Sequence, residues 1–367
     1  MLGKRSWEKW AWLRIWACLG QCVLGCGLGL LLCVAPSLAG PAEELVLLNW
    51  AEYMDKSLLA QFEQETGVHI REVFFQTEDE RDGLLAQTSG VGFDVVVVQA
   101  KDIEAYARSG WLAPIEEEKI PNLAHIPNKW RTTYPETDRY AVPWQWGTFG
   151  IGYRKDLLKK EITSWMDFFR PIPEAKGRLL MLSDAMVMRT LAMKATGRSM
   201  NDFTDPSLKE AAGLLREQKP FVHTYGYLGL GEQSPLITGQ YWMALLFNGD
   251  AVTLAKQNAN IGFVIPKEGT LLWEDCFAIL AASKRKDLAA RFIHFLHQPQ
   301  NAARLAEFTN YASVNDGVNP FLSAQHRGNM TIYPPQEVLD RSEFPKNPPP
   351  KVTRFFKNLQ VQLMRKE

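Results

Sequence analysis

The sequence predicts an α/β fold built on open sheets. After residue 41, strand-like and helix-like segments alternate, and the run Phe93–Val98 is apolar apart from Asp94, as in a strand covered on both faces. The second half of the chain repeats this class of elements without repeating the sequence. Open α/β sheets bind ligands outside the carboxyl ends of their strands, so we expect a ligand site at those ends.

The first half predicts strands and helices in strict alternation. The first helix places Leu58, Leu59 and Phe62 on one face and ends at Gly67, which is typical of a helix C-terminus. A further short helix ends at Gly110. The expected elements are Leu45–Trp50, Ser57–Thr66, His69–Phe75, Asp82–Ser89, Phe93–Val98 and Ile103–Ser109.

In the second half, the stretch Tyr140–Tyr153 is rich in aromatic residues and glycine, which favours an extended connection between two lobes. The prolines at 348–350 indicate a semi-rigid spacer before the last helix. The other expected strands are Arg178–Leu182, Tyr241–Phe247, Ile261–Ile265 and a run around Cys276, and the expected helices are Ala185–Thr196, Leu208–Glu217, Leu288–His297, Gln300–Phe308 and Thr353–Met364.

The charge balance argues against a nucleic-acid-binding protein. The 367 residues carry 41 Lys and Arg and 41 Asp and Glu, with 46% hydrophobic residues. Such a composition is that of an ordinary globular protein of two domains. It argues against an extended basic surface of the kind that binds nucleic acid. Without the first 39 residues the chain has a slight acidic excess, which is compatible with a cationic ligand.

The N-terminal segment predicts export. Residues 1–39 combine a basic start with an apolar stretch, and Ser37-Leu38-Ala39 offers a cleavage site after Ala39. Two alternatives stay open. The uncharged stretch 15–42 is long enough for an uncleaved membrane anchor, and Cys26 lies in a partial lipoprotein signal.

Catalytic and metal-binding motifs are missing from the sequence. Cys276 is the single cysteine after the leader, so no disulfide or cysteine-based zinc site is expected; it reads as a buried hydrophobe rather than a reactive thiol. His294 and His297 are spaced to share a metal, but packed or solvent-facing histidines explain them as well. The glycines of 226–231 favour a mobile loop over a phosphate cradle. We therefore expect no cofactor and no metal.

Aromatic residues stand beside carboxylates at the expected strand ends. Aromatic faces attract ammonium groups by about 0.5 to 2 kcal/mol, and a hydrogen bond to a carboxylate adds about 1.5 to 3 kcal/mol, so together they suggest a cation-binding box. Core packing is the alternative for each aromatic residue, and Asp184 alone would serve as a helix N-cap. The residues concerned are Trp50, Tyr53, Trp144, Trp146, Asp184, Trp273, Glu274 and Asp275.

At these residues the chain resembles a known family, the spermidine/putrescine-binding component of polyamine ABC transporters. The matching segments are Asn49–Tyr53, Leu59–Gly67, Val142–Gly147 and Pro266–Asp275, and the resemblance covers nearly the whole chain after the leader. It implies a type II periplasmic-binding-protein fold, in which two α/β lobes, each an open sheet flanked by helices, clamp a polyamine in their cleft. It also implies a periplasmic location and inner-membrane permease subunits as partners.

The resemblance implies a ligand pocket, and this chain departs from its pattern. A tyrosine of the family falls at Lys101, a glutamate at Val187 and a tryptophan at Phe247, so we expect Lys101 and Val187 to tune the ligand toward lower charge. Lys101 would either point inward or lie in solvent beside Asp102 and Glu104. The implied ligand-binding residues are Trp50, Tyr53, Asp184, Phe247, Trp273, Asp275 and Tyr311.

The family's crossing segments suggest the lobe boundaries. Lobe 1 is expected to comprise 41–146 and 275–312, and lobe 2 to comprise 150–272 and 318–367, in a monomer. The preferred function is capture of a putrescine-like or spermidine-like cation for an ABC transporter. Another amine or zwitterion as ligand, and a membrane-anchored sensing domain, remain alternatives. An enzyme is disfavoured because no activated nucleophile accompanies Asp184 and Asp275.

Overall fold

A computed structural model describes residues 43–365, so the expected leader lies outside the described part of the chain. Its strands form two sheets that share the 13-residue strand β4 (Val142–Arg154). The predicted two-lobed α/β fold is thereby confirmed, with each lobe built on one sheet. None of the helices within 43–365 has the length and apolar character to cross a membrane.

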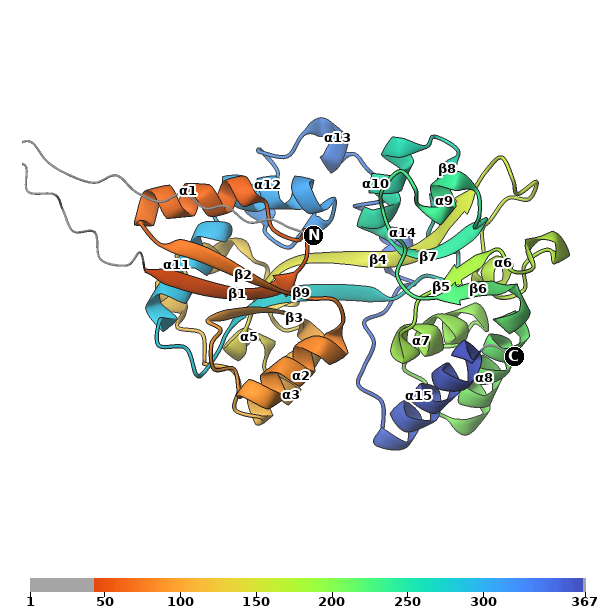
Figure 1. Cartoon of the computed structure of the whole chain (residues 1–367), viewed down its shortest axis with the longest axis horizontal. Coiled ribbons are helices and arrows are strands. Elements are labelled where there is room, and N and C mark those ends of the chain that lie inside the picture. The colour runs from red at the N-terminus through yellow and green to blue at the C-terminus, as the bar shows by residue number, and fades with distance from the viewer. Residues whose placement is uncertain (1–42, 366–367) are drawn as a thin grey trace, which may run out of the picture. The chain divides into compact units, whose positions relative to one another are not determined.

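The first sheet has the strand order β2-β1-β3-β9-β4 (Figure 1). Strand β1 pairs in parallel with β2 and β3, whereas β9 runs antiparallel to both β3 and β4. Its strands other than β4 are β1 (Glu44–Trp50), β2 (His69–Phe75), β3 (Val95–Gln99), β9 (Leu272–Ile279) and the short β10 (Ala312–Ser313), which pairs with β4.

Helices cover both faces of this sheet (Figure 1). Because side chains alternate along a strand, Leu47 packs with Phe62 and Phe292 on one face and Leu48 with Leu85 on the other. One face carries α1 (Lys56–Thr66), α11 (Lys286–Leu296) and α12 (Pro299–Thr309), and the other carries α2 (Glu78–Thr88), α3 (Ile103–Arg108) and α5 (Thr137–Tyr140).

The second sheet continues from β4 with the order β4-β7-β5-β6, and β8 also pairs with β4. The pairs of β4 with β7 and β8 are antiparallel, and β5 is parallel to β6 and β7. The strands are β5 (Leu179–Met181), β6 (Val222–Tyr225), β7 (Met243–Phe247) and β8 (Ile261–Val264).

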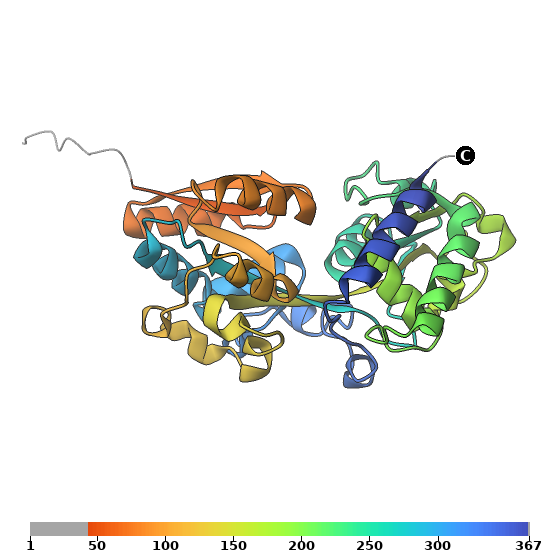
Figure 2. The ribbon, with the colours of Figure 1, turned by 90° about the horizontal axis from the view of Figure 1, so that it is seen from below.

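This sheet is also covered on both faces. Leu245 of β7 packs with Leu191 and Leu359, whereas its neighbour Leu246 packs with Leu254. The C-terminal helix α15 lies beside α7 and α8 (Figure 2). The helices of this lobe are α6 (Trp165–Phe169), α7 (Ala185–Ala195), α8 (Asp205–Gln218), α9 (Pro235–Thr238), α10 (Asn248–Gln257) and α15 (Pro350–Met364); the remaining short helices are α4 (Asn128–Arg131), α13 (Ala324–Arg327) and α14 (Gln336–Leu339).

Three segments connect the lobes. Strands β4 and β9 are two of them, which confirms the predicted extended connection. The third includes Glu343, whose backbone N–H donates to the Thr270 carbonyl at 2.9 Å and whose carboxylate meets Lys194 of α7 at 3.1 Å. Two residues further on, the Pro345 carbonyl accepts a hydrogen bond from the Tyr134 hydroxyl at 2.9 Å. This last segment therefore contacts both lobes.

Helix α2 begins four residues earlier than the sequence predicted. Thr77 caps it, with its hydroxyl accepting a hydrogen bond from the Glu80 N–H at 3.1 Å, and three acidic residues in the first turn suit the positive end of the helix dipole. The expected helix from Asp82 missed this turn because the turn has no apolar residue. The correction matters because Glu78, the first residue of the helix, lines the cavity described below.

The segment that begins at residue 318 was expected in lobe 2, but its first residues pack in lobe 1. Val318 and Leu322, which the sequence places in lobe 2, pack against Ala302 and Ala303 of α12 in lobe 1. The physical reason is the alanine-rich face of α12, which leaves room for these two side chains. Helix α15 packs against α7 in lobe 2. The lobe boundaries as a set stay a proposal.

Candidate ligand-binding site

A cavity of about 290 Å³ lies where the two lobes meet. It opens at the carboxyl ends of β1, β3 and β7, as expected for open α/β sheets, and is floored by the crossing strand β9. We call it the inner cavity. Its lining residues are Trp50, Ala51, Tyr53, Phe75, Gln76, Glu78, Gln99, Tyr227, Phe247, Asp250, Trp273, Asp275 and Tyr311.

Six of the seven residues implied by the family resemblance line this cavity. They come from the end of β1, the end of β7, β9 and the residue pair after α12, so the fold gathers positions that are far apart in the sequence. They are Trp50, Tyr53, Phe247, Trp273, Asp275 and Tyr311. Their role in ligand binding stays a proposal.

Asp275 is a buried carboxylate of strand β9, with 3% of its surface exposed. The Tyr53 hydroxyl donates a hydrogen bond of 2.6 Å to its Oδ2 atom, and its buried Oδ1 atom has no partner among the described residues. Burial raises the pKa of Asp275 to about 6, against a smaller opposing effect of the Tyr53 hydrogen bond. A buried carboxylate oxygen without a donor is prepared to accept one from a ligand.

Asp250 is a second carboxylate of the inner cavity, and the sequence analysis missed it. It belongs to the first turn of α10, and the Tyr311 hydroxyl lies 3.4 Å from its Oδ1 atom as a hydrogen-bond donor. Burial raises the pKa of Asp250 to about 7. Its position three residues after Phe247 is a usable signal, but Asn248-Gly249 is as typical of a turn that ends a strand as of the start of a helix.

Four aromatic rings of the cavity contact one another edge to face. Trp273 and Tyr311 have ring centroids 4.7 Å apart at 89°, Phe247 meets Trp273 at 5.9 Å, and Tyr53 meets Tyr311 at 6.3 Å. Such contacts hold each ring in a defined orientation. The result is an apolar wall beside the two carboxylates, suited to methylene groups that join positive charges.

Two glycines make room for this wall. A Cβ atom at Gly147 would lie 2.4 Å from the Trp273 ring, and one at Gly249 would lie 2.5 Å from the Tyr311 ring. Both distances are far below van der Waals contact, so any larger residue would displace the ring. Gly147 belongs to β4 and Gly249 to α10, and each therefore positions a cavity aromatic through the absence of its own side chain.

A second cavity of about 450 Å³ adjoins the inner one, and we call it the outer cavity. Glu78 and Tyr227 line both cavities and mark the boundary between them. Lys101 lines the outer cavity, where its ammonium donates to Glu78 at 3.0 Å and to Asp102 at 2.8 Å. Its side chain is only 12% exposed, so the prediction of a solvent-facing Lys101 is wrong.

Asp184 lies in the outer cavity rather than with Asp275. Its carboxylate caps α7 by accepting a hydrogen bond from the Val187 N–H at 2.7 Å, which agrees with the N-cap alternative, and burial raises its pKa. The Val187 side chain packs in the core of lobe 2 and is not among the residues of either cavity. Asp184 therefore serves as the N-cap of α7 at the edge of the outer cavity, whereas Val187 takes part only through its backbone N–H.

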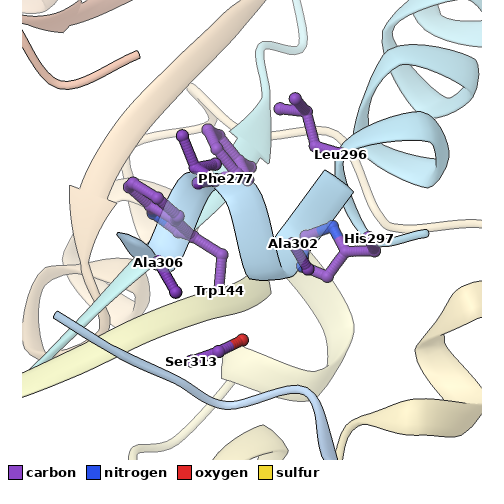
Figure 3. Close-up of a pocket in the computed structure, with 8 residues that line it drawn as sticks. Trp144, Phe277, Leu296, His297, Ala302, Ala306 and Ser313 are labelled. Atoms are coloured by element: carbon purple, nitrogen blue, oxygen red, sulfur yellow. The ribbon is translucent and has the colours of Figure 1, made fainter. Parts of the chain in front are cut away.

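A third, much smaller cavity belongs to the core of lobe 1 (Figure 3). Its volume of about 10 Å³ is at most that of one water, so it is too small for a solute. His297 lines it and is held by the carbonyls of Pro143 and Ile293 at 2.9 and 2.8 Å. This confirms the reading of His297 as a packed histidine, and Cys276 is likewise buried.

The fold and this cleft define a solute-binding protein. The family model of bacterial extracellular solute-binding proteins matches residues 57–328, and the chain belongs to this family. The predicted extracytoplasmic solute-binding role is thereby confirmed at the level of the family.

Individual relatives are similar in sequence over most of the chain. The spermidine/putrescine-binding periplasmic protein of Escherichia coli is 29% identical over 303 residues, which cover 82% of this chain and 86% of the relative. The norspermidine sensor of Vibrio cholerae is 28% identical over 300 residues, or 81% of this chain and 82% of the relative. A solved spermidine/putrescine ABC transporter substrate-binding protein from Streptococcus pneumoniae superposes with a TM-score of 0.77 at 24% identity, covering 88% of this chain and 98% of that one.

Proposed function

We propose that this protein captures a polyamine of the putrescine or spermidine kind and delivers it to an ABC transporter. The observation that carries the proposal is the unpartnered Oδ1 atom of Asp275 inside an aromatic cavity. An ammonium group satisfies this oxygen and restores the charge that burial disfavours, which a neutral solute cannot do.

The second carboxylate, Asp250, favours a ligand with two ammonium groups joined by a chain of methylenes. Asp250 and Asp275 both line the inner cavity, and neither has a Lys, Arg or His partner among the ion pairs of residues 43–365. Tyr311 interacts with both: burial and the charges of Asp250 and Asp275 raise the pKa of its hydroxyl, which donates to Asp250. A flexible diamine places one ammonium on each carboxylate and its methylenes on the aromatic wall.

The family and its relatives support the cellular setting. We place the protein in the periplasm as a monomer, with inner-membrane permease subunits of an ABC transporter as the partners that accept the ligand. The proposed role is binding and release, without a chemical step. The expected leader would direct export, and N-terminal sequencing of the exported protein tests whether it is cleaved after Ala39.

Thermal denaturation with a panel of solutes tests the proposal. The panel comprises putrescine, cadaverine, spermidine, norspermidine, γ-aminobutyrate and a neutral diol of the same length. A ligand at about 100 times its dissociation constant adds roughly 2.7 kcal/mol of stability, which is a readily measured shift. We expect shifts for amines and none for the diol. A shift confined to γ-aminobutyrate would favour the zwitterion alternative instead.

A sensing role is the second candidate, favoured by the relative that is named a norspermidine sensor. Such a protein would bind the same class of ligand but pass on a signal rather than the ligand. Uptake of radiolabelled polyamine in cells with and without the protein separates the two roles. Lost uptake in its absence supports transport, whereas unchanged uptake with altered polyamine responses supports sensing.

A further inference from the structure

The inner and outer cavities differ in how their carboxylates are partnered. In the inner cavity, the side-chain partners of Asp250 and Asp275 among residues 43–365 are tyrosine hydroxyls. In the outer cavity, Glu78 and Asp102 are both bonded to the Lys101 ammonium at 3.0 and 2.8 Å. The Lys101 ammonium therefore already neutralises Glu78, the carboxylate at which the two cavities meet.

Lys101 is held in a defined place rather than free to move away. Arg81 also reaches Asp102, at 3.4 Å, and Asp82, at 3.2 Å, so the two bases and three acids form one cluster at the outer cavity. Although burial opposes it, Asp102 and Glu78 raise the pKa of Lys101, and the positive charge of Lys101 in turn opposes, as a smaller effect, the rise in pKa that burial causes at Asp275 and Asp184. The ammonium thus remains charged and acts on carboxylates of both cavities.

We propose that Lys101 is a built-in ammonium that limits the ligand to two positive charges. The inference rests on the proposed function and names the ligand within that class: a linear diamine. Glu78 lies on the boundary of the inner cavity and is the acid that a third ammonium would meet there. The Lys101 ammonium already forms an ion pair with the Glu78 carboxylate.

Two physical reasons favour the tethered ammonium over a ligand's third one. Lys101 is already held by Asp102 and Glu78 in the ligand-free protein, whereas a ligand's third ammonium would reach Glu78 only at the cost of ordering further rotatable bonds. A third ammonium near Glu78 would also lie close to the positive charge of Lys101, and like charges in a partly buried site repel strongly. At the boundary between the cavities, the triamine therefore gains no unpaired carboxylate for its extra charge and meets a repulsion.

Calorimetric titration of putrescine and spermidine into the intact protein and its variants tests this inference. We expect the unmodified protein to bind the diamine at least about tenfold more tightly than the triamine. Lys101→Gln frees Glu78 and should raise the ratio of triamine to diamine affinity at least about tenfold, the size of one charge-assisted hydrogen bond. Lys101→Arg keeps the charge and should keep the diamine preference.

A matched control separates local from overall charge. Lys119 also bridges two carboxylates, Glu116 and Asp287, but lies in neither cavity, so Lys119→Gln should leave the affinity ratio unchanged. Equal or tighter binding of spermidine by the unmodified protein would overturn the inference while leaving the proposed function intact, and so would a folded Lys101→Gln variant with an unchanged ratio. Absence of binding by both amines would overturn the proposed function, and the inference with it.

Discussion

Tyr53 and Asp275, 222 residues apart in the sequence, are joined by a hydrogen bond of 2.6 Å across the inner cavity. The bond orients the carboxylate so that one oxygen is engaged and the other, Oδ1, is left to the cavity. Since Tyr53 follows β1 and Asp275 lies on the crossing strand β9, the bond also fixes the wall of the cavity relative to its floor.

The first prediction concerns Asp275. Asp275→Asn should weaken amine binding by about 2 to 5 kcal/mol, or about 30-fold and more, because a ligand ammonium loses its charged partner. The ligand-free protein should keep its melting temperature or gain, since a buried carboxylate is removed. Calorimetry measures the affinity and thermal denaturation the stability.

Glu274 supplies the control for that variant. It is the next residue on β9, is also buried, and its side chain points to the opposite face of the strand from the cavity. Glu274→Gln should therefore change amine affinity by less than about threefold. Equal losses in the two variants would show that the general charge of the strand, rather than the cavity carboxylate, holds the ligand.

The second prediction concerns Asp250, which the resemblance did not indicate. Asp250→Asn should weaken binding of a diamine about tenfold or more but leave binding of a monoamine of the same chain length nearly unchanged, because only the diamine has a second ammonium for it. Titrations of putrescine and butylamine measure this. If both amines lose affinity equally, Asp250 does not act as the second anchor.

The third prediction is a pH dependence of stability in the ligand-free protein. Burial raises the pKa of Asp275 to about 6, of Asp250 to about 7 and of Glu274 to about 8, so between pH 4 and 8 these three carboxyl groups bind more protons in the folded state than in the unfolded one. Their contribution to stability should therefore fall as pH rises through this window, by about 2 kcal/mol from Asp275 alone. Urea denaturation at pH 5 and pH 8 measures it.

Ligand binding should show the opposite slope. An ammonium needs an ionised carboxylate, so binding releases protons near pH 6 and affinity should be at least about tenfold weaker at pH 5 than at pH 8. Titration in buffers of different ionisation enthalpy counts the released protons. A pH-independent affinity would mean that the two carboxylates are not part of the ligand site.

The fourth prediction concerns the glycine beneath Trp273. Gly147→Ala should destabilise the protein by about 1 to 3 kcal/mol and weaken amine binding, because its Cβ would lie 2.4 Å from the Trp273 ring. Gly83→Ala is the matched control: it lies in α2 with open space around the new Cβ and should be neutral or stabilising. Denaturation curves of both variants measure the contrast, and equal effects would contradict it.

Much of the fold could be predicted from local patterns. Strand β2 was predicted with its observed bounds, and α1, α7 and β3 within two residues at either end, because each combines a clear apolar period with a defined stop such as Gly67. The first turn of α2 and the whole of α10 were not predicted. Both begin with polar residues, and the Asn248-Gly249 pair that starts α10 is equally typical of a turn.

The candidate site could be predicted only in part. Aromatic residues and carboxylates at strand ends indicated its chemistry, and the structure gathers six of the named residues. What the sequence could not provide was pairing between distant elements: Lys101 is joined to Glu78 on another helix, and Asp184 lies in the outer rather than the inner cavity. Such partners depend on how helices dock on the sheet, and the hydrophobic periodicity of a single segment carries no information about that docking.

A crystal structure of the protein with putrescine tests the central claim most directly. The account predicts one ammonium within about 2.7 to 2.9 Å of the Asp275 Oδ1 atom, the second on Asp250, and the methylenes against Trp273 and Tyr311. Putrescine bound away from Asp275, or an inner cavity holding only water at saturating ligand, would contradict it.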